Sequence, residues 1–102
     1  MTFVMTHRTG RMERSEDLSA IDRLLGELDS IDTEHPDIAL SYDGEWSLSV
    51  FADGTVVWEN VEEGEPRHMR EVTKDRAAVL LRAVASGRQS DIEDEAWLPG
   101  YK

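Results

Sequence analysis

A histidine and two carboxylates lie within four consecutive residues of this chain, in Glu34-His35-Pro36-Asp37. Imidazole and carboxylate groups bind divalent metals and can also form an acid–base pair. Proline pushes the residue before it out of helical geometry, so the same four residues also form a turn from which Asp37 starts a strand. We interpret them as a turn. A small metal-dependent or acid–base enzyme that uses His35 is the alternative.

The familiar catalytic signatures do not occur in the sequence. It contains no cysteine, which excludes thiolate nucleophiles, disulfides and thiolate metal sites. It also has no glycine-rich phosphate loop, no Gly-x-Ser-x-Gly and no His-Glu-x-x-His. His7 and His68 stand beside arginines, without a carboxylate close in sequence, and we interpret both as ordinary surface residues of strands. We therefore predict a protein that is not an enzyme and has no cofactor and no bound metal.

The charge of the chain is its least ordinary property. There are 22 acidic and 11 basic residues, for a formal net charge of -11 at pH 7. Because like charges repel, such a surface disfavours direct binding to nucleic acid phosphates and to anionic membranes. Acidic residues gather in residues 13–45 and 53–65, whereas arginine and lysine gather in residues 67–88.

Rows of carboxylates can complement a basic groove on another protein and accelerate encounter with it. We therefore expect a basic protein partner; a solvated surface with internal ion pairs is the alternative. Trp46 and Trp58 occupy comparable positions in neighbouring strands, either as core partners or as an exposed aromatic binding patch. The candidate partner-binding residues are Asp22, Glu27, Asp29, Glu59, Glu62, Glu63, Glu65 and Trp58.

Two amphipathic helices must position these residues. Apolar residues recur every three or four positions over residues 18–28, with acids on the other side and Ser15 as N-cap. A second helix begins after Thr73 as N-cap, and Ser86-Gly87 ends it. Residues 91–102 are too short and mixed for an element of their own, but Trp97 can dock them on the body.

Alternating apolar residues predict a hairpin between residues 38–42 and 46–50, with Asp43-Gly44 as its tight turn. Asp53-Gly54 makes a second two-residue turn into a strand over residues 55–61, and residues 68–72 could add a fourth strand. A short strand over residues 2–7 is also indicated. The expected fold is one α+β domain, residues 1–102, with an antiparallel three- to four-stranded meander and two helices packed on one face.

The chain resembles the small acidic immunity proteins that bacteria keep against their own secreted toxins. The resemblance lies in size, charge, missing catalytic signatures and the order helix, meander, helix. It is carried by the acidic blocks 13–45 and 53–65, the strands 46–51 and 55–61, and the tail 97–101. It implies a cytoplasmic, non-catalytic inhibitor that binds tightly over a toxin's active site. An acidic nucleic-acid mimic that blocks a nuclease is the alternative. No apolar run is long enough for a signal peptide or a membrane span.

Overall fold

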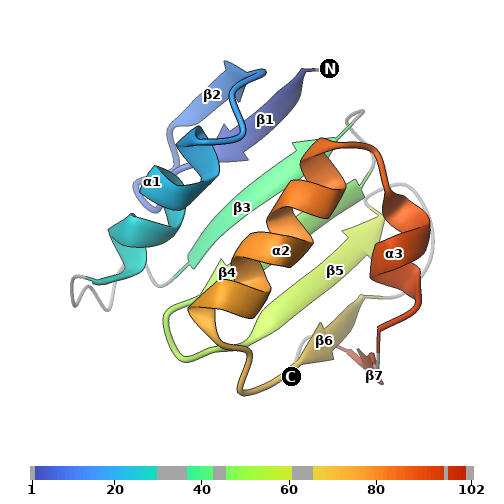
Figure 1. The fold of residues 1–102 in the computed structure, drawn as a ribbon. Helices are drawn as coiled ribbons and strands as arrows, with labels where there is room; N and C mark the ends of the chain where they lie inside the picture. Colours follow the sequence, from blue (N-terminus) through green and yellow to red (C-terminus); the bar gives the residue numbers. More distant parts are fainter. Residues whose placement is uncertain (1, 30–36, 43–45, 61–65, 96, 101–102) are drawn as a thin grey trace.

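The computed structural model describes residues 2–29, 37–42, 46–60, 66–95 and 97–100. In this part of the chain an antiparallel sheet has its strands in the order β2-β1-β3-β4-β5-β6-β7, and the helices lie on one of its faces (Figure 1). The α+β class, the antiparallel sheet and its one helix-covered face are as the sequence predicted. Among the described residues the sheet is wider than expected, with seven strands in place of three or four, and three α-helices are present in place of two. No helix among the described residues is long and apolar enough to cross a membrane.

Along the chain, a β-hairpin comes first and one helix follows it. Four strands come next, and then two helices and a short final strand. They are β1 (Phe3–Thr6), β2 (Met12–Ser15), α1 (Ala20–Gly26), the 3-10 turn η1 (Glu27–Asp29), β3 (Asp37–Tyr42), β4 (Trp46–Phe51), β5 (Val56–Asn60), β6 (Arg67–Met69), α2 (Lys74–Ala85), α3 (Gln89–Glu93) and β7 (Leu98–Pro99).

The predicted central hairpin is formed by β3 and β4. Ile38 pairs with Val50 and Leu40 with Leu48, and all four side chains are buried under the helices. The residues between them, Ala39 and Ser41 on β3 and Ser47 and Ser49 on β4, pair on the opposite face. This alternation is what a sheet with one covered face requires. The turn residue Gly44 lies outside the described residues.

The helices close the core with one apolar stripe each. Ile21 and Leu24 of α1 and Leu81 and Val84 of α2 are fully buried against the sheet. Complete burial of one such side chain contributes about 1.5–3 kcal/mol. The start of α2 is as predicted, because Thr73 Oγ1 accepts a hydrogen bond from Arg76 N at 3.2 Å. Its end is also as predicted, since Gly87 follows with a φ of 74°.

The start of α1 differs from the sequence prediction. Ser15 is not an N-cap: it ends β2, an unpredicted strand, where it pairs with Phe3, and its hydroxyl accepts from Asp17 N at 3.0 Å. The helix begins only at Ala20, and Leu18 is 42% exposed. The short polar strand Met12–Ser15 has no apolar alternation to reveal it, because it lies at the sheet edge and three of its four side chains are exposed.

The tail also differs, because it forms α3 and β7. Ile92 of α3 is fully buried, and its carbonyl accepts from Trp97 Nε1 at 2.7 Å. Leu98 then pairs with His68, which adds β7 to the edge of the sheet. Trp97 therefore docks the tail as expected. The docked tail also forms secondary structure, because Ile92 packs in the core and Leu98 pairs with β6.

The second Asp-Gly turn has three residues rather than two. Phe51 N donates to Thr55 O at 2.8 Å, which leaves Ala52, Asp53 and Gly54 as the loop. Gly54 has a φ of 91°, the left-handed conformation that three-residue hairpins need at their last position. Its carbonyl accepts from Val72 N at 2.9 Å, so the turn also holds the segment that leads into α2.

We predict that Gly54→Val lowers the free energy of unfolding by about 1–3 kcal/mol, because a β-branched residue is strained at positive φ. A Cβ at this position would also lie 3.4 Å from Val72 O. Gly26→Ala is the matched control: Gly26 is helical, and an added Cβ meets nothing within 4 Å. Urea unfolding should show the control unchanged or stabilised by up to about 1 kcal/mol. Equal midpoints for the parent and Gly54→Val would contradict the turn.

Candidate functional site

Asp22 of α1 is exposed, as predicted, but its charge is compensated. Its carboxylate oxygens accept from Arg82 Nη2 of α2 at 2.8 and 2.9 Å. The two side chains are 60% and 41% exposed, and such surface pairs contribute about 0–1 kcal/mol. The pair joins α1 to α2, so Asp22 marks a junction between the two helices rather than an isolated acid on an outer face.

Glu27 does not face outward with Asp22. Its Oε2 lies 2.5 Å from His7 Nδ1, and its Oε1 accepts from Arg8 N at 3.1 Å. The other ring nitrogen of His7, Nε2, lies 2.8 Å from Glu13 Oε1. When both carboxylates are ionised they only accept, so both ring nitrogens donate and the imidazole is a cation, whose charge Arg11 Nη2 at 3.3 Å from Nε2 opposes. His7 therefore clamps the end of β1 to β2 and to η1.

The hydrogen bonds of His7 shift the pKa values of His7 and Glu13. Burial lowers the pKa of His7 and nearby Arg11 opposes its charge, but the hydrogen bonds to Glu27 and Glu13 outweigh both and raise the pKa above 6.5. The same hydrogen bond to His7 is the main reason why the pKa of Glu13 is lowered. Interpreting His7 as an ordinary surface residue was wrong, since its side chain is only 13% exposed. Its partners lie six and twenty residues away, beyond any local pattern.

His68 was also wrongly interpreted as a surface residue. It is 3% exposed on β6, and its Nδ1 lies 3.0 Å from the carbonyl of Gly100. This contact fastens the tail to the sheet edge beside the pairing of His68 with Leu98. The backbone of Gly100 adds a second link, because its N–H donates to Pro66 O at 2.9 Å.

Trp58 cannot serve as an exposed partner contact, because it is fully buried. Its ring stacks on Trp46 with centroids 4.8 Å apart, so the core-partner alternative is the correct one. Its Nε1 donates to Glu93 Oε1 at 3.0 Å, and Arg67 binds the same carboxylate through two nitrogens at 2.7 and 2.8 Å. The hydrogen bonds from Arg67 are the main cause of the lowered pKa of Glu93. Truncating Trp58 would therefore test folding rather than binding.

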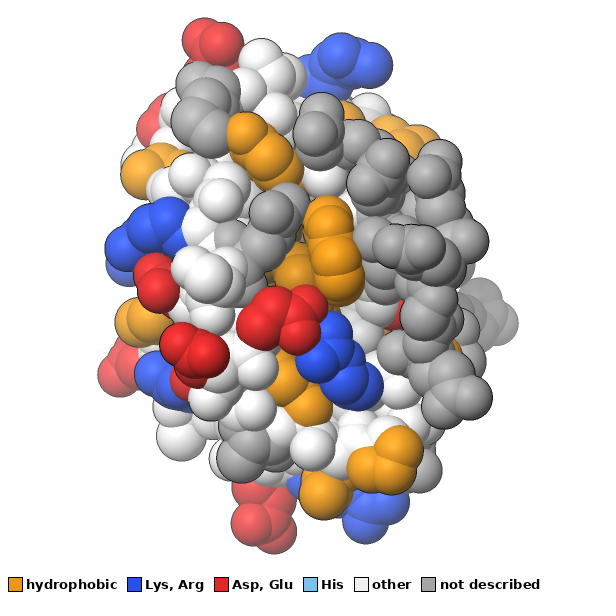
Figure 2. Space-filling view, turned by 90° about the vertical axis from the view of Figure 1, so that its right-hand side faces the viewer, with side chains coloured by type: hydrophobic (Ala, Val, Ile, Leu, Met, Phe, Trp, Pro, Cys, Tyr) orange, Lys and Arg blue, Asp and Glu red, His pale blue; other side chains and the backbone are white. Residues whose placement is uncertain are grey.

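The predicted acidic residues do not converge on one described surface. Glu59 follows the buried Trp58 along β5 and pairs with Ser47, which places it on the sheet face opposite α1. Asp29 ends η1, and Glu62, Glu63 and Glu65 lie outside the described residues. On the side of the molecule that carries α3, acidic, basic and apolar side chains are interspersed (Figure 2).

The first motif, Glu34-His35-Pro36-Asp37, is described only at Asp37, where β3 begins. This agrees with Asp37 as the start of a strand, whereas the predicted turn at Glu34, His35 and Pro36 lies outside the described residues. Burial raises the pKa of its carboxyl. Within the described ranges, no three histidine or acidic side chains are grouped so that they could hold a metal ion.

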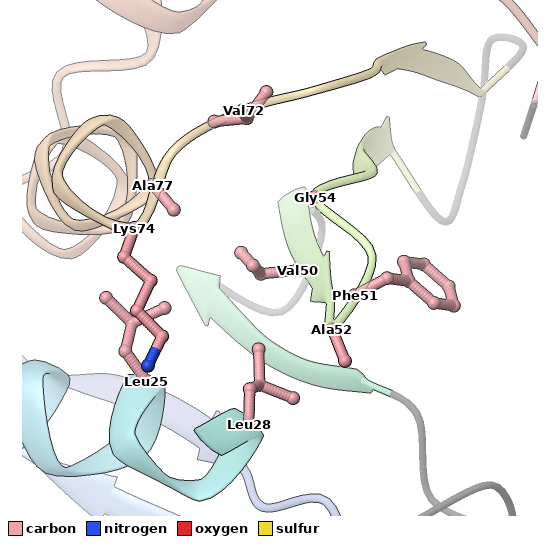
Figure 3. A pocket seen from close by; sticks show the side chains of 9 residues that line it. All are labelled: Leu25, Leu28, Val50, Phe51, Ala52, Gly54, Val72, Lys74 and Ala77. Carbon is pink, nitrogen blue, oxygen red and sulfur yellow. The ribbon is translucent and has the colours of Figure 1, made fainter. Parts of the chain in front are cut away.

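Two adjoining hollows between α1 and α2 were not foreseen. The first, the apolar hollow, has about 60 Å³ and is lined by residues from α1, η1, β4, the turn after β4, the segment before α2 and α2 itself (Figure 3): Leu25, Leu28, Val50, Phe51, Ala52, Gly54, Val72, Lys74 and Ala77. The second, the acidic hollow, has about 210 Å³ and is lined by Asp22, Leu25, Gly26, Lys74, Asp75 and Ala78. The two hollows share Leu25 and Lys74 in their linings, and together they are here called the α1–α2 groove.

The clamp predicts a specific pH dependence. Since the pKa of His7 is raised in the fold, its stabilisation is complete below the unfolded value of 6.5 and is lost as pH rises through the folded value. The difference in unfolding free energy between the parent and His7→Gln should thus be larger at about pH 6 than at about pH 9. Urea unfolding at both pH values measures it. A difference that is equal at both would show that His7 is not a cation in the fold.

Comparison of the chain with protein-family models, with curated proteins and with solved structures finds no match. The groups that could serve a function are therefore those that the structure itself shows. These are a compensated acid at the junction of two helices, a histidine clamp, and a groove that is apolar at one end and acidic at the other.

Proposed function

We propose that the protein is a non-catalytic inhibitor that binds a basic protein partner, and that it acts as an immunity protein which neutralises a bacterial toxin in the cytoplasm. The observation that carries this proposal is the net charge of -11 on 102 residues. A charge of this size on a small surface attracts a basic protein over several ångströms and increases the rate of encounter. It also repels nucleic acid, so a toxin with a basic substrate groove fits better than a nucleic acid as the partner.

The described structure supplies exposed carboxylates mainly around its helices. Those around the helices are Glu16, Asp17, Asp22, Asp75, Asp91, Glu93 and Asp94, and Glu13, Asp53 and Glu71 are exposed elsewhere in the described residues. Glu27 and Trp58 are no longer part of the proposed interface, because the first is bound to His7 and the second is buried. Asp29, Glu59, Glu62, Glu63 and Glu65 remain in it as proposals.

The nucleic-acid mimic is less well supported than a toxin inhibitor. A mimic needs a row of uncompensated charges that copies the spacing of phosphates. Here arginines interrupt the acids, as in the ion pairs Asp22 with Arg82, Glu93 with Arg67 and Glu95 with Arg76. An ordinary protein interface with a charged rim requires no such row.

The proposal predicts a toxin in the adjacent gene. Expression of that gene's product alone should stop the growth of a bacterial host, and co-expression of this chain should restore growth. The two purified proteins should form a stable complex in which the toxin's activity is lost. Growth arrest that a folded, co-expressed inhibitor does not relieve would contradict the proposal.

Charge steering predicts how that complex forms. The association rate constant should fall by about tenfold or more between low and high salt, because salt screens charges within about 8 Å at physiological ionic strength. Reversal of Glu62, Glu63 and Glu65 to lysine should slow association while the melting temperature stays unchanged. The matched change of the same three residues to glutamine should slow it less. Stopped-flow measurements that show no dependence on salt or on these charges would rule out an acidic interface.

A further inference from the structure

The two nitrogens of the His7 ring have different surroundings. Nδ1 faces Glu27 Oε2 of η1 at 2.5 Å. Nε2 faces two groups of opposite charge, because Glu13 Oε1 of β2 lies 2.8 Å away and Arg11 Nη2 of the turn between β1 and β2 lies 3.3 Å away. The His7 side chain is only 13% exposed, so the ring depends on these groups more than on water for its hydrogen bonds.

The two groups at Nε2 require opposite states of this nitrogen. An ionised carboxylate only accepts hydrogen bonds, so Glu13 binds Nε2 only when Nε2 carries a hydrogen. A guanidinium only donates, so Arg11 binds Nε2 only when its lone pair is free. Nε2 therefore cannot bind both groups at once, and the proton on it decides which one it binds.

His7 is the member of this cluster that changes its charge near neutral pH, since carboxylates titrate well below that range and arginine well above it. The charged ring donates from both nitrogens, to Glu27 and to Glu13. The neutral ring has one hydrogen left. On Nδ1 this hydrogen preserves the bond to Glu27 and lets Nε2 accept from Arg11, whereas on Nε2 it would leave the Nδ1 lone pair facing a carboxylate.

Two further arginines act on the partners of the ring. Arg8 donates to Glu27 through its backbone N–H at 3.1 Å and through its guanidinium to the Glu27 carbonyl. Arg23 of α1 helps to lower the pKa of Glu13 through its charge. Both arginines stay charged while His7 titrates, so they keep the two carboxylates ionised in both states of the ring.

We propose that His7 is a proton-controlled switch that exchanges one partner for another. The charged ring binds Glu13 of β2 through Nε2, and the neutral ring keeps its hydrogen on Nδ1 and accepts from Arg11 instead. The bond to Glu27 of η1 persists in both states. The side-chain bond to the edge strand β2 exists only in the charged state, and this inference does not depend on the proposed function.

Imidazole ¹⁵N signals of the full-length protein test the exchange directly, because a ring nitrogen with a hydrogen and one without give well-separated signals. Long-range ¹H–¹⁵N spectra are recorded below and above the titration of His7, and His7→Gln identifies its signals. Below the titration both nitrogens should carry a hydrogen, and above it only Nδ1. Histidine in water prefers the hydrogen on Nε2, so the expected form is not the default. A neutral ring with its hydrogen on Nε2 would overturn the proposal.

A pair of variants tests the part played by Arg11. Arg11→Met removes the donor that the neutral ring needs and a charge that opposes the charged ring, so His7 should bind its proton at least about threefold more tightly. The Arg11 side chain is 68% exposed, so the fold should be kept. Arg14→Met is the matched control, because Arg14 follows Glu13 on β2 and therefore points to the other face of the sheet. It should change the proton affinity by less than about twofold. Equal titration of His7 in the two variants would overturn the switch.

Glu13→Gln tests the other partner. The charged ring then loses an anionic acceptor at Nε2, so His7 should bind its proton at least about threefold more weakly than in the parent. The neutral ring should still carry its hydrogen on Nδ1, because Glu27 and Arg11 are unchanged. An unchanged proton affinity would show that Glu13 is not the partner of the charged ring and would also overturn the switch.

Discussion

The buried contact between the central hairpin and α2 is the interaction on which the other elements depend. Leu40 and Leu48 face each other across β3 and β4, and both are fully buried, as is Leu81 of α2. In a 102-residue chain without disulfides, one such core has to offset the entropy of ordering the whole backbone. The strands β2 and β7 lie at the edges of the sheet that this contact holds together.

The uneven distribution of charge along the sequence has a structural explanation. The basic segment 67–88 forms β6 and α2, and these elements lie between acids contributed by other parts of the chain. Arg82 binds Asp22 of α1, Arg67 binds Glu93 of α3, and Arg76 binds Glu95 after α3. Each pair joins two elements, and together they reduce the self-repulsion that a net charge of -11 imposes on the fold.

Periodic segments could be predicted from sequence, because their patterns record which side faces the core. The strands β3, β4 and β5 and the helix α2 show clear alternation or an apolar stripe, and they appear where expected. Short elements without a pattern could not be found: β2 is polar and β7 has two residues. Both exist because a neighbouring strand offers hydrogen bonds, which is a tertiary property.

The site was harder to predict than the fold for the same reason. Exposure of a charged residue can be guessed from helical periodicity, but its partner cannot. Glu27 lies on the polar side of the first helix pattern, yet it is bound to His7, which is twenty residues away. Trp58 was ambiguous because a tryptophan suits both a core and an interface, and in the structure it packs in the core, stacks on Trp46 and donates to the carboxylate of Glu93.

The openness of the α1–α2 groove follows from the small residues along the junction of the two helices. Gly26, Ala77 and Ala78 carry little or no side chain where α1 faces α2, whereas Leu24 and Leu81 below them are fully buried. A seven-residue helix such as α1 is too short to be stable by propensity alone, so its place depends on this lower, buried layer. The upper layer can then remain open without loss of the fold.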